Sequence, residues 1–331
     1  MTNLAGIVLF LGVVLYAMFG GADFGAGFWD LTAGGPARGR RVRELIDDTL
    51  APVWEANHTW LIYCLVVLWT AFPAAFSAIM TTLFLPLGLA ALGIVLRGSG
   101  FAFRKVSVLT AAQRAAGGVF AISSIVTPFF FGAVAGGIAS GRVPTDGSGD
   151  LIRSWVNPTS LLGGVLAVIV CAYLAAVFLV AEARRRADSG LERAFRHRAL
   201  GAAGAAGVVS LAGIGVLHAD SPRLFDRLLG PGLPFVLVSV ASGLAALILL
   251  RRAQPRFLRV LAVLAVAAVI LGWGVAQYPY LLGTHLSLAE GAAPQATLVS
   301  VAVVFGAAAV LVIPSLGLLY LLQQRGRLEG A

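Results

Sequence analysis

The sequence contains little charge for its length. Only 12% of its 331 residues are charged, whereas 59% are hydrophobic, and the mean hydropathy is +0.91. Soluble domains carry about one quarter charged residues, so this composition excludes an ordinary soluble protein. Long, uniformly apolar runs also exclude a β-barrel, whose strands would alternate polar and apolar residues. The sequence therefore predicts an all-α polytopic membrane protein.

Residues that could hold a metal or haem are also scarce. The two cysteines, Cys64 and Cys171, lie within apolar runs and lack the spacing of a metal site, so we interpret them as small hydrophobic residues. P-loop and GxSxG patterns are missing, which argues against a self-contained enzyme of the soluble type. We expect no metal or cofactor to be bound by this chain, because its four histidines are predicted in places that cannot share one embedded haem: His58 within a span, His197 in an inner loop, His218 at an outer helix end and His285 in an outer loop.

Apolar runs and helix-breaking residues divide the chain into nine predicted spans. No Lys or Arg precedes the apolar part of the first run, and no cleavage site of small residues lies before its glycine-rich stretch, so we expect this run to be retained as a span. The turn at Phe72 and Pro73 is short, which predicts that the second and third spans are antiparallel neighbours. No linker interrupts residues 1–331, which we expect to form one membrane unit with spans near 2–30, 50–71, 74–99, 115–140, 159–182, 199–218, 232–250, 257–277 and 295–322.

Basic residues are unevenly divided between the two predicted sides. All but four of the 24 Lys and Arg residues fall on one side of the nine spans, the exceptions being Arg142, Arg153, Arg223 and Arg227. The positive-inside rule then predicts an outside N-terminus and a cytoplasmic C-terminus. The net charge of +9 could suggest nucleic acid, but the arginines occupy short loops without interleaved aromatic residues. Anionic lipid of the inner leaflet is the better predicted partner.

Three ionisable residues from consecutive spans are predicted at one depth. Asp23 lies seven residues before Asp30, and Arg97 lies seven residues before Arg104, so each is about 10 Å inside the inner surface. Glu55, near the start of the second span, reaches about the same depth. Ionisable groups in a membrane normally face the bundle interior, pair with one another and mark ion or proton pathways. We therefore expect Asp23, Glu55 and Arg97 to form a cluster.

Two interpretations of this cluster remain open at this point. Two carboxylates sharing one arginine form a site suited to proton transfer, because burial and like charge raise proton affinity. The alternative is a structural ion pair in which Arg97 neutralises one carboxylate. His58, one turn after Glu55, could pass protons near neutral pH or could equally be a satisfied core histidine.

Small residues and tryptophans near the cluster predict close packing. Gly21 and Gly25 repeat at a spacing of four residues, which lets transmembrane backbones approach closely. Packing explains these glycines but leaves Asp23 unexplained. Trp54 and Trp60 are predicted to fill helix contacts or subunit contacts rather than to carry chemistry.

Three segments closely resemble, in order, hallmark motifs of subunit II of the cytochrome bd quinol oxidases. They are GADFGAGFWDL at 21–31, APVWEANHTWLI at 51–62 and LRGSGFAFR at 96–104. The nine-span arrangement with an outside N-terminus also matches that family. The sequence departs from the usual pattern with Glu55 where many members have Asp, and with His58 where Gln or Glu is common. Glutamate keeps the carboxylate but reaches one methylene further.

The resemblance implies a subunit of a terminal oxidase in a bacterial cytoplasmic membrane. A haem-bearing subunit I would hold haems b and d, or b alone, and the site that oxidises quinol, while oxygen is reduced to water. Subunit II would be haem-free, stabilise its partner, and supply a cytoplasmic proton route and oxygen access. Asp23 and Glu55 match the acidic residues implicated in proton transfer, and Arg97 lies near them. A small single-span accessory subunit, lipid or quinone are further partners compatible with the resemblance.

Two rival functions are retained. A proton-coupled secondary transporter would also contain intramembrane carboxylates, and it predicts inverted repeats and broken helices, neither of which is clear in the sequence. A purely structural anchor for a haem protein would use the charged cluster only to fix its helices. A visible spectrum of the native complex separates these functions, since a transporter would be colourless.

Overall fold

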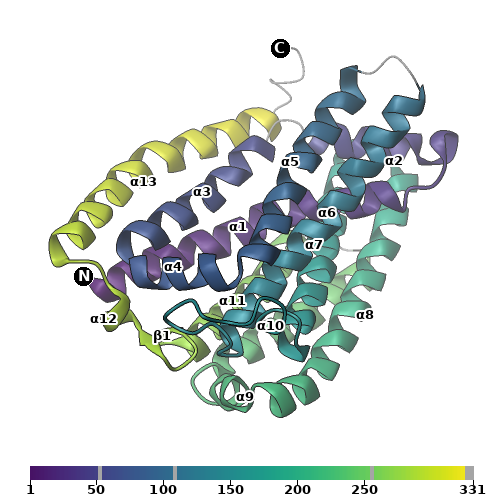
Figure 1. Cartoon of the computed structure of the whole chain (residues 1–331). Coiled ribbons are helices and arrows are strands. Elements are labelled where there is room, and N and C mark those ends of the chain that lie inside the picture. Colours follow the sequence, from purple (N-terminus) through teal and green to yellow (C-terminus); the bar gives the residue numbers. More distant parts are fainter. Residues whose placement is uncertain (51–53, 107–109, 254–256, 325–331) are drawn as a thin grey trace.

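Helices make up nearly all of the regular structure. The computed structural model describes residues 1–50, 54–106, 110–253 and 257–324 (Figure 1). In chain order the helices are α1 (Thr2–Leu31), α2 (Pro36–Leu50), α3 (Trp54–Ala71), α4 (Pro73–Thr82), α5 (Phe84–Val106), α6 (Thr110–Ala139), α7 (Pro158–Arg185), α8 (Ser189–Asp220), α9 (Pro222–Leu229), α10 (Leu233–Arg251), α11 (Leu258–Gln277), α12 (Leu288–Gly291) and α13 (Gln295–Gln324).

A small antiparallel hairpin adds the strands that the sequence did not predict. Strand β1 (Tyr280–Leu282) pairs with β2 (Leu286–Ser287) between α11 and α12. Ser287 then caps α12 through a reciprocal pair of bonds with Glu290, so the hairpin leads directly into a short helix. The prediction of an all-α membrane protein is otherwise confirmed.

The predicted third span, 74–99, is wrong in its boundaries. Pro73 begins the short helix α4, which is bent by 119° from the preceding helix, and the spanning helix α5 begins only at Phe84. Within the described ranges, eight helices are long and apolar enough to cross a membrane, or up to nine if α3 and α4 together form one bent span. The expected antiparallel hairpin around Phe72 and Pro73 is therefore replaced by a broken helix.

Two polar segments that were expected to be loops are helical. Residues 36–50 form α2, which begins at a proline. Helix α8 begins ten residues earlier than the predicted 199 because the Asp188 carboxylate accepts bonds from the backbone N–H groups of Gly190 and Leu191. His197, expected in a loop, consequently lies on this helix.

Helix α1 packs at the centre of the bundle. It contacts α3, α6 and α7, while α5 with α6, α6 with α7, α7 with α8 and α10 with α11 form further neighbouring pairs. At Gly25 the α1 and α7 backbones meet so closely that a Cβ atom there would lie 1.8 Å from the carbonyl oxygen of Cys171. The absence of a side chain therefore lets these helices make contact.

One end of α1 and α7 carries the larger buried cluster. Trp29, Leu174, Phe195 and Leu258 belong to it, and Trp29 Nε1 donates a hydrogen bond to the carbonyl oxygen of Ala172 at 2.8 Å.

By contrast, α13 lies along the edge of the bundle in Figure 1 and presents exposed apolar side chains over most of its length. Lipid or a partner subunit suits such a surface.

Candidate functional site

Asp23 and Arg97 form a buried ion pair between α1 and α5. Arg97 Nη2 donates to Asp23 Oδ1 at 2.7 Å and to the Asp23 carbonyl oxygen at 3.2 Å. The two residues are only 1% and 2% exposed. Such burial of charge is tolerated only when the charges are paired and hydrogen-bonded. The structure thus brings together two of the predicted site residues.

Helix α6 completes the surroundings of Arg97. Ser124 Oγ accepts a bond from Arg97 Nε at 3.0 Å and donates one to the Phe120 carbonyl oxygen at 2.6 Å. The guanidinium carbon also lies 5.1 Å from the Phe24 ring centroid and 5.0 Å from that of Phe120. Cation–π contacts and a fixed acceptor therefore hold the guanidinium in one orientation.

A second ionic group, here called the Asp30 network, lies at the C-terminal end of α1. It consists of Asp30, Arg43, Arg104 and Asp47. Arg104 pairs with both Asp30 and Asp47, and Arg43 Nε donates to the second oxygen of Asp30 at 2.8 Å. The Asp30 side chain is 4% exposed and that of Asp47 is 31% exposed. The network therefore leads from the accessible surface of α2 to the interior.

Sequence reasoning placed Asp30 and Arg104 only as markers of the membrane surface. A usable indication was present, because Asp23 and Asp30 are seven residues apart and so are Arg97 and Arg104. Seven residues make about two turns, so each pair occupies one helix face. Matching this spacing between α1 and α5 would have predicted two ion pairs at two depths, Asp23 with Arg97 and Asp30 with Arg104. The role of Ser124 had no comparable indication in the sequence.

His58 of α3 packs against two aromatic residues of α1 that lie near the ion pair. Its ring centroid is 6.0 Å from that of Phe24 and 6.3 Å from that of Tyr16, both in near-perpendicular arrangements. The side chains of Glu55 and Trp54 lie outside the part of the chain that the structure describes. Trp60 packs at 6.1 Å from the Tyr63 ring. The membership of Glu55 in the cluster therefore stays a prediction.

The two predicted packing glycines differ in what surrounds them. Gly25 lies against the Cys171 backbone, as described above, whereas a Cβ at Gly21 would meet only side-chain atoms of Leu174 and Cys171 at 3.5 and 3.6 Å. The latter distances are ordinary van der Waals contacts. Close backbone approach therefore requires glycine at position 25 and not at position 21.

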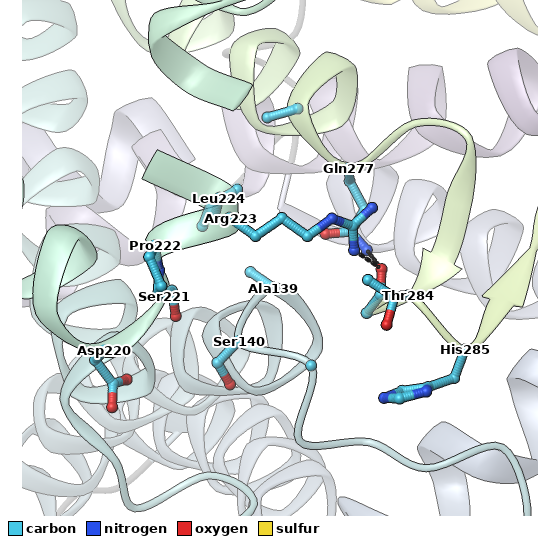
Figure 2. Close-up of a pocket in the computed structure, with 13 residues that line it drawn as sticks. Ala139, Ser140, Asp220, Ser221, Pro222, Arg223, Leu224, Gln277, Thr284 and His285 are labelled. Atoms are coloured by element: carbon cyan, nitrogen blue, oxygen red, sulfur yellow. Dashed lines mark hydrogen bonds between the residues drawn. The ribbon is translucent and has the colours of Figure 1, made fainter. Parts of the chain in front are cut away.

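A cavity of about 230 Å³ lies at the opposite end of the bundle from the Asp30 network. The ends of α6, α8 and α11 line it together with the hairpin, and Figure 2 shows Arg223 reaching across it. Arg142 pairs with both oxygens of Asp220 at its edge, and Thr159 donates two more bonds to this carboxylate, from its backbone N–H and its hydroxyl. These polar groups join the helix ends, so this cavity resembles a structural junction more than a reaction site.

Among the described residues, no group of three or more His, Cys, Asp or Glu side chains could hold a metal ion. The chemistry supported by Asp23, Arg97 and the Asp30 network is acid–base chemistry and charge stabilisation. Carboxylates can accept and release protons, while the arginines remain charged at any physiological pH.

Comparison with solved structures gives a match over the whole length. The structure of bd oxidase from Geobacillus thermodenitrificans contains a chain that superposes with a TM-score of 0.81 at 25% sequence identity, covering 100% of this chain and 99% of that chain. The arrangement of α1 to α13 is therefore shared with a chain of that oxidase.

Curated relatives match over shorter segments. Cytochrome bd ubiquinol oxidase subunit 2 from Bacillus subtilis is 29% identical over 168 residues, which are 50% of this chain and 47% of that protein. Cytochrome bd-I ubiquinol oxidase subunit 2 from Escherichia coli strain K12 is 28% identical over 171 residues, 48% of this chain and 44% of that protein. The chain thus spans about half the length of the curated relatives it matches.

A family model covers much more of the chain than these pairwise matches. The model described as cytochrome bd terminal oxidase subunit II matches residues 1–323. This range includes all three motifs that carry the resemblance and both partners of the buried Asp23–Arg97 pair. With sequence, fold and the motif-bearing residues in agreement, the chain belongs to the cytochrome bd terminal oxidase subunit II family.

Proposed function

We propose that this chain is the haem-free subunit of a quinol-oxidising, oxygen-reducing complex and that it carries protons from the cytoplasm toward a haem-bearing subunit I. Membership of the subunit II family, and similarity to two ubiquinol oxidase subunits, support the assignment to an oxidase. Haems b and d, or b alone, would lie in subunit I. The N-terminus would face outside, and the complex would lie in the bacterial cytoplasmic membrane.

The observation that carries this proposal is that the two oxygens of the Asp23 carboxylate differ in their hydrogen bonding. Oδ1 is bonded to Arg97, whereas the buried Oδ2 has no hydrogen-bond partner among the described residues. A carboxylate that served only to neutralise Arg97 would be expected to have both oxygens bonded, because buried polar atoms seldom lack partners. Oδ2 is therefore available to accept a proton or a proton-carrying water.

The Asp30 network provides the entrance of the proposed route. Its partly exposed Asp47 can exchange protons with the cytoplasm, and Asp30 lies two helical turns from Asp23 on the same face of α1. Protons would then pass through Asp23 to Glu55 and His58. Arg97 would stabilise the negative charge that remains on Asp23 after each transfer, because a nearby fixed cation favours the ionised form.

Substitutions in the assembled complex test this route. Asp23→Asn and Glu55→Gln keep side-chain size but remove a titrating carboxyl, and we expect each to lower the rate of oxygen reduction by at least about tenfold at normal haem content. Asp220→Asn is the matched control, since it removes a carboxyl at the opposite end of the bundle. Normal rates in both Asp23→Asn and Glu55→Gln would disprove the route.

A visible spectrum of the native complex tests the assignment to an oxidase separately. We expect the chain to co-purify with a subunit that shows haem absorption, together with bound lipid or quinone and with or without a small accessory subunit. The rival function of a proton-coupled transporter predicts a colourless preparation. The break between α3 and α4 is of the kind that a transporter predicts, but membership of the subunit II family favours the oxidase.

A further inference from the structure

A tyrosine that the proposed route does not include lies next to its central carboxylate. Tyr16 is on α1, two turns before Asp23, and its hydroxyl oxygen is buried without a hydrogen-bond partner among the described residues. Asp23 Oδ2 is likewise buried and has no hydrogen-bond partner among the described residues. Two buried polar atoms without partners on one helix require explanation, because a buried polar atom that remains unsatisfied destabilises a protein.

The Tyr16 ring is folded along α1 toward Asp23. A Cβ atom at Gly20 would lie 3.0 Å from Tyr16 Cε2, which shows that the ring covers the glycine on the C-terminal side of Tyr16. Its ring centroid is 6.4 Å from that of Phe24, the residue after Asp23. Side chains on a helix normally point toward its N-terminus. Gly20 therefore provides the space that allows the Tyr16 side chain to lie in the opposite direction.

Aromatic groups surround the Tyr16 ring on its other sides. The rings of Phe24, His58 and Phe131 are each in an edge-to-face arrangement with it, from α1, α3 and α6. Tyr16 lies seven residues before Asp23 and therefore on the same face of α1. The hydroxyl can donate one hydrogen bond and accept two, while a carboxylate oxygen only accepts. The donor and acceptor types are thus complementary.

We propose that Tyr16 is a positioning residue for Asp23, acting through one internal water molecule that bridges Tyr16 Oη and Asp23 Oδ2. The hydroxyl and the carboxylate oxygen would supply two of the two to four polar partners that a buried water needs. The water would hold Oδ2 in the orientation from which protons are exchanged. This inference rests on the proposed proton route and adds to it a fixed water site and the residue that holds it.

Infrared difference spectroscopy on the complete oxidase tests the water site. We expect the wild type to show a carboxyl band that Asp23→Asn abolishes and a water O–H band that shifts in H₂¹⁸O. Tyr16→Phe should remove the water band and shift the carboxyl band. A wild-type spectrum without an H₂¹⁸O-sensitive band, or a Tyr16→Phe spectrum identical to that of the wild type, would overturn the proposal.

Rates of oxygen reduction test the consequence for transfer. Tyr16→Phe should lower the rate by about tenfold, the effect of losing one hydrogen bond to a charged group, and should increase the solvent deuterium isotope effect at unchanged haem content. Tyr63→Phe is the control, because the Tyr63 hydroxyl donates to the Val8 carbonyl oxygen away from Asp23. Equal rates and isotope effects in Tyr16→Phe and Tyr63→Phe would overturn the inference.

A second variant covers the case in which Tyr16→Phe does not assemble. Gly20→Ala keeps the hydroxyl but crowds Cε2 of the ring, so it should shift the same carboxyl and water bands. Unchanged bands in this variant would contradict the geometry on which the inference rests. If Asp23→Asn and Glu55→Gln both have normal rates while Tyr16→Phe still shifts the carboxyl band, the proton route fails and the water site remains. If these two variants are slow and Tyr16→Phe changes nothing, the water site alone fails.

Discussion

Asp23 and Arg97 form an ion pair at 2.7 Å across the contact between α1 and α5, and neither side chain is more than 3% exposed. The two residues are 74 positions apart in the chain. The ion pair forms only if each helix keeps its position along its axis and its rotation about that axis. A shift in sequence register of one residue turns a helical side chain by about 100°. The pair is consequently sensitive to any change that displaces either helix.

Removing one partner of this pair should destabilise the protein strongly. Arg97→Gln leaves the Asp23 carboxylate buried without its cation, and we expect a loss of about 3–5 kcal/mol. Arg40→Gln is the control, since the Arg40–Glu44 pair is 76% and 60% exposed and should contribute no more than about 0.5 kcal/mol. Unfolding in detergent measures the loss of stability in both variants. The double variant Asp23→Asn with Arg97→Gln should lose less unfolding free energy than the sum of the losses in the two single variants.

Ser124 and Ser123 provide a matched pair of substitutions on α6. Ser124→Ala removes the acceptor of Arg97 Nε and leaves a charged donor unsatisfied, so we expect a cost of about 1–3 kcal/mol. Within the described part of the chain, the Ser123 hydroxyl bonds only to carbonyl oxygens of its own helix, so Ser123→Ala should be close to neutral. Equal unfolding midpoints for the two variants would contradict this account of Arg97.

Gly25 and Gly21 should respond differently to alanine. Gly25→Ala places a Cβ atom 1.8 Å from the Cys171 carbonyl oxygen, which separates α1 from α7 and should cost about 3 kcal/mol or prevent assembly. Gly21→Ala makes ordinary contacts and should assemble normally. The yield of assembled complex, followed by size-exclusion chromatography, distinguishes them, and equal yields would contradict the packing described here.

The start of α8 should weaken in acid. Hydrogen bonding from the Leu191 N–H, assisted by Arg41, holds the pKa of Asp188 below its usual value. Its contribution to stability is therefore present above the unfolded pKa of about 3.9 and is lost as the pH falls through the lower folded pKa. The difference in thermal midpoint between the wild type and Asp188→Ala should be present at pH 7 and vanish in strong acid. A difference that does not change with pH would contradict this assignment.

Much of the fold was predictable because membrane helices are specified by local composition. Hydrophobic length identified α1, α7, α10, α11 and α13 with boundaries close to those observed, since an apolar segment in lipid must satisfy its backbone internally. The errors occur where a helix lacks that composition or breaks within it. Polar α2 and the polar start of α8 are cases of the first kind. The bend between α3 and α4 is a case of the second, where Pro73 starts a new helix.

The sequence by itself determined that this chain is a helical membrane protein and that Asp23 and Arg97, as charges in apolar segments, require a partner. Only the tertiary structure decided that they are partners of one another, that Ser124 and Phe120 hold the guanidinium, and that Arg104 joins Asp30 to Asp47. Depth along a helix follows from counting residues at a fixed rise. The direction in which each face points depends on how the helices pack, and that is set by contacts between segments distant in the chain.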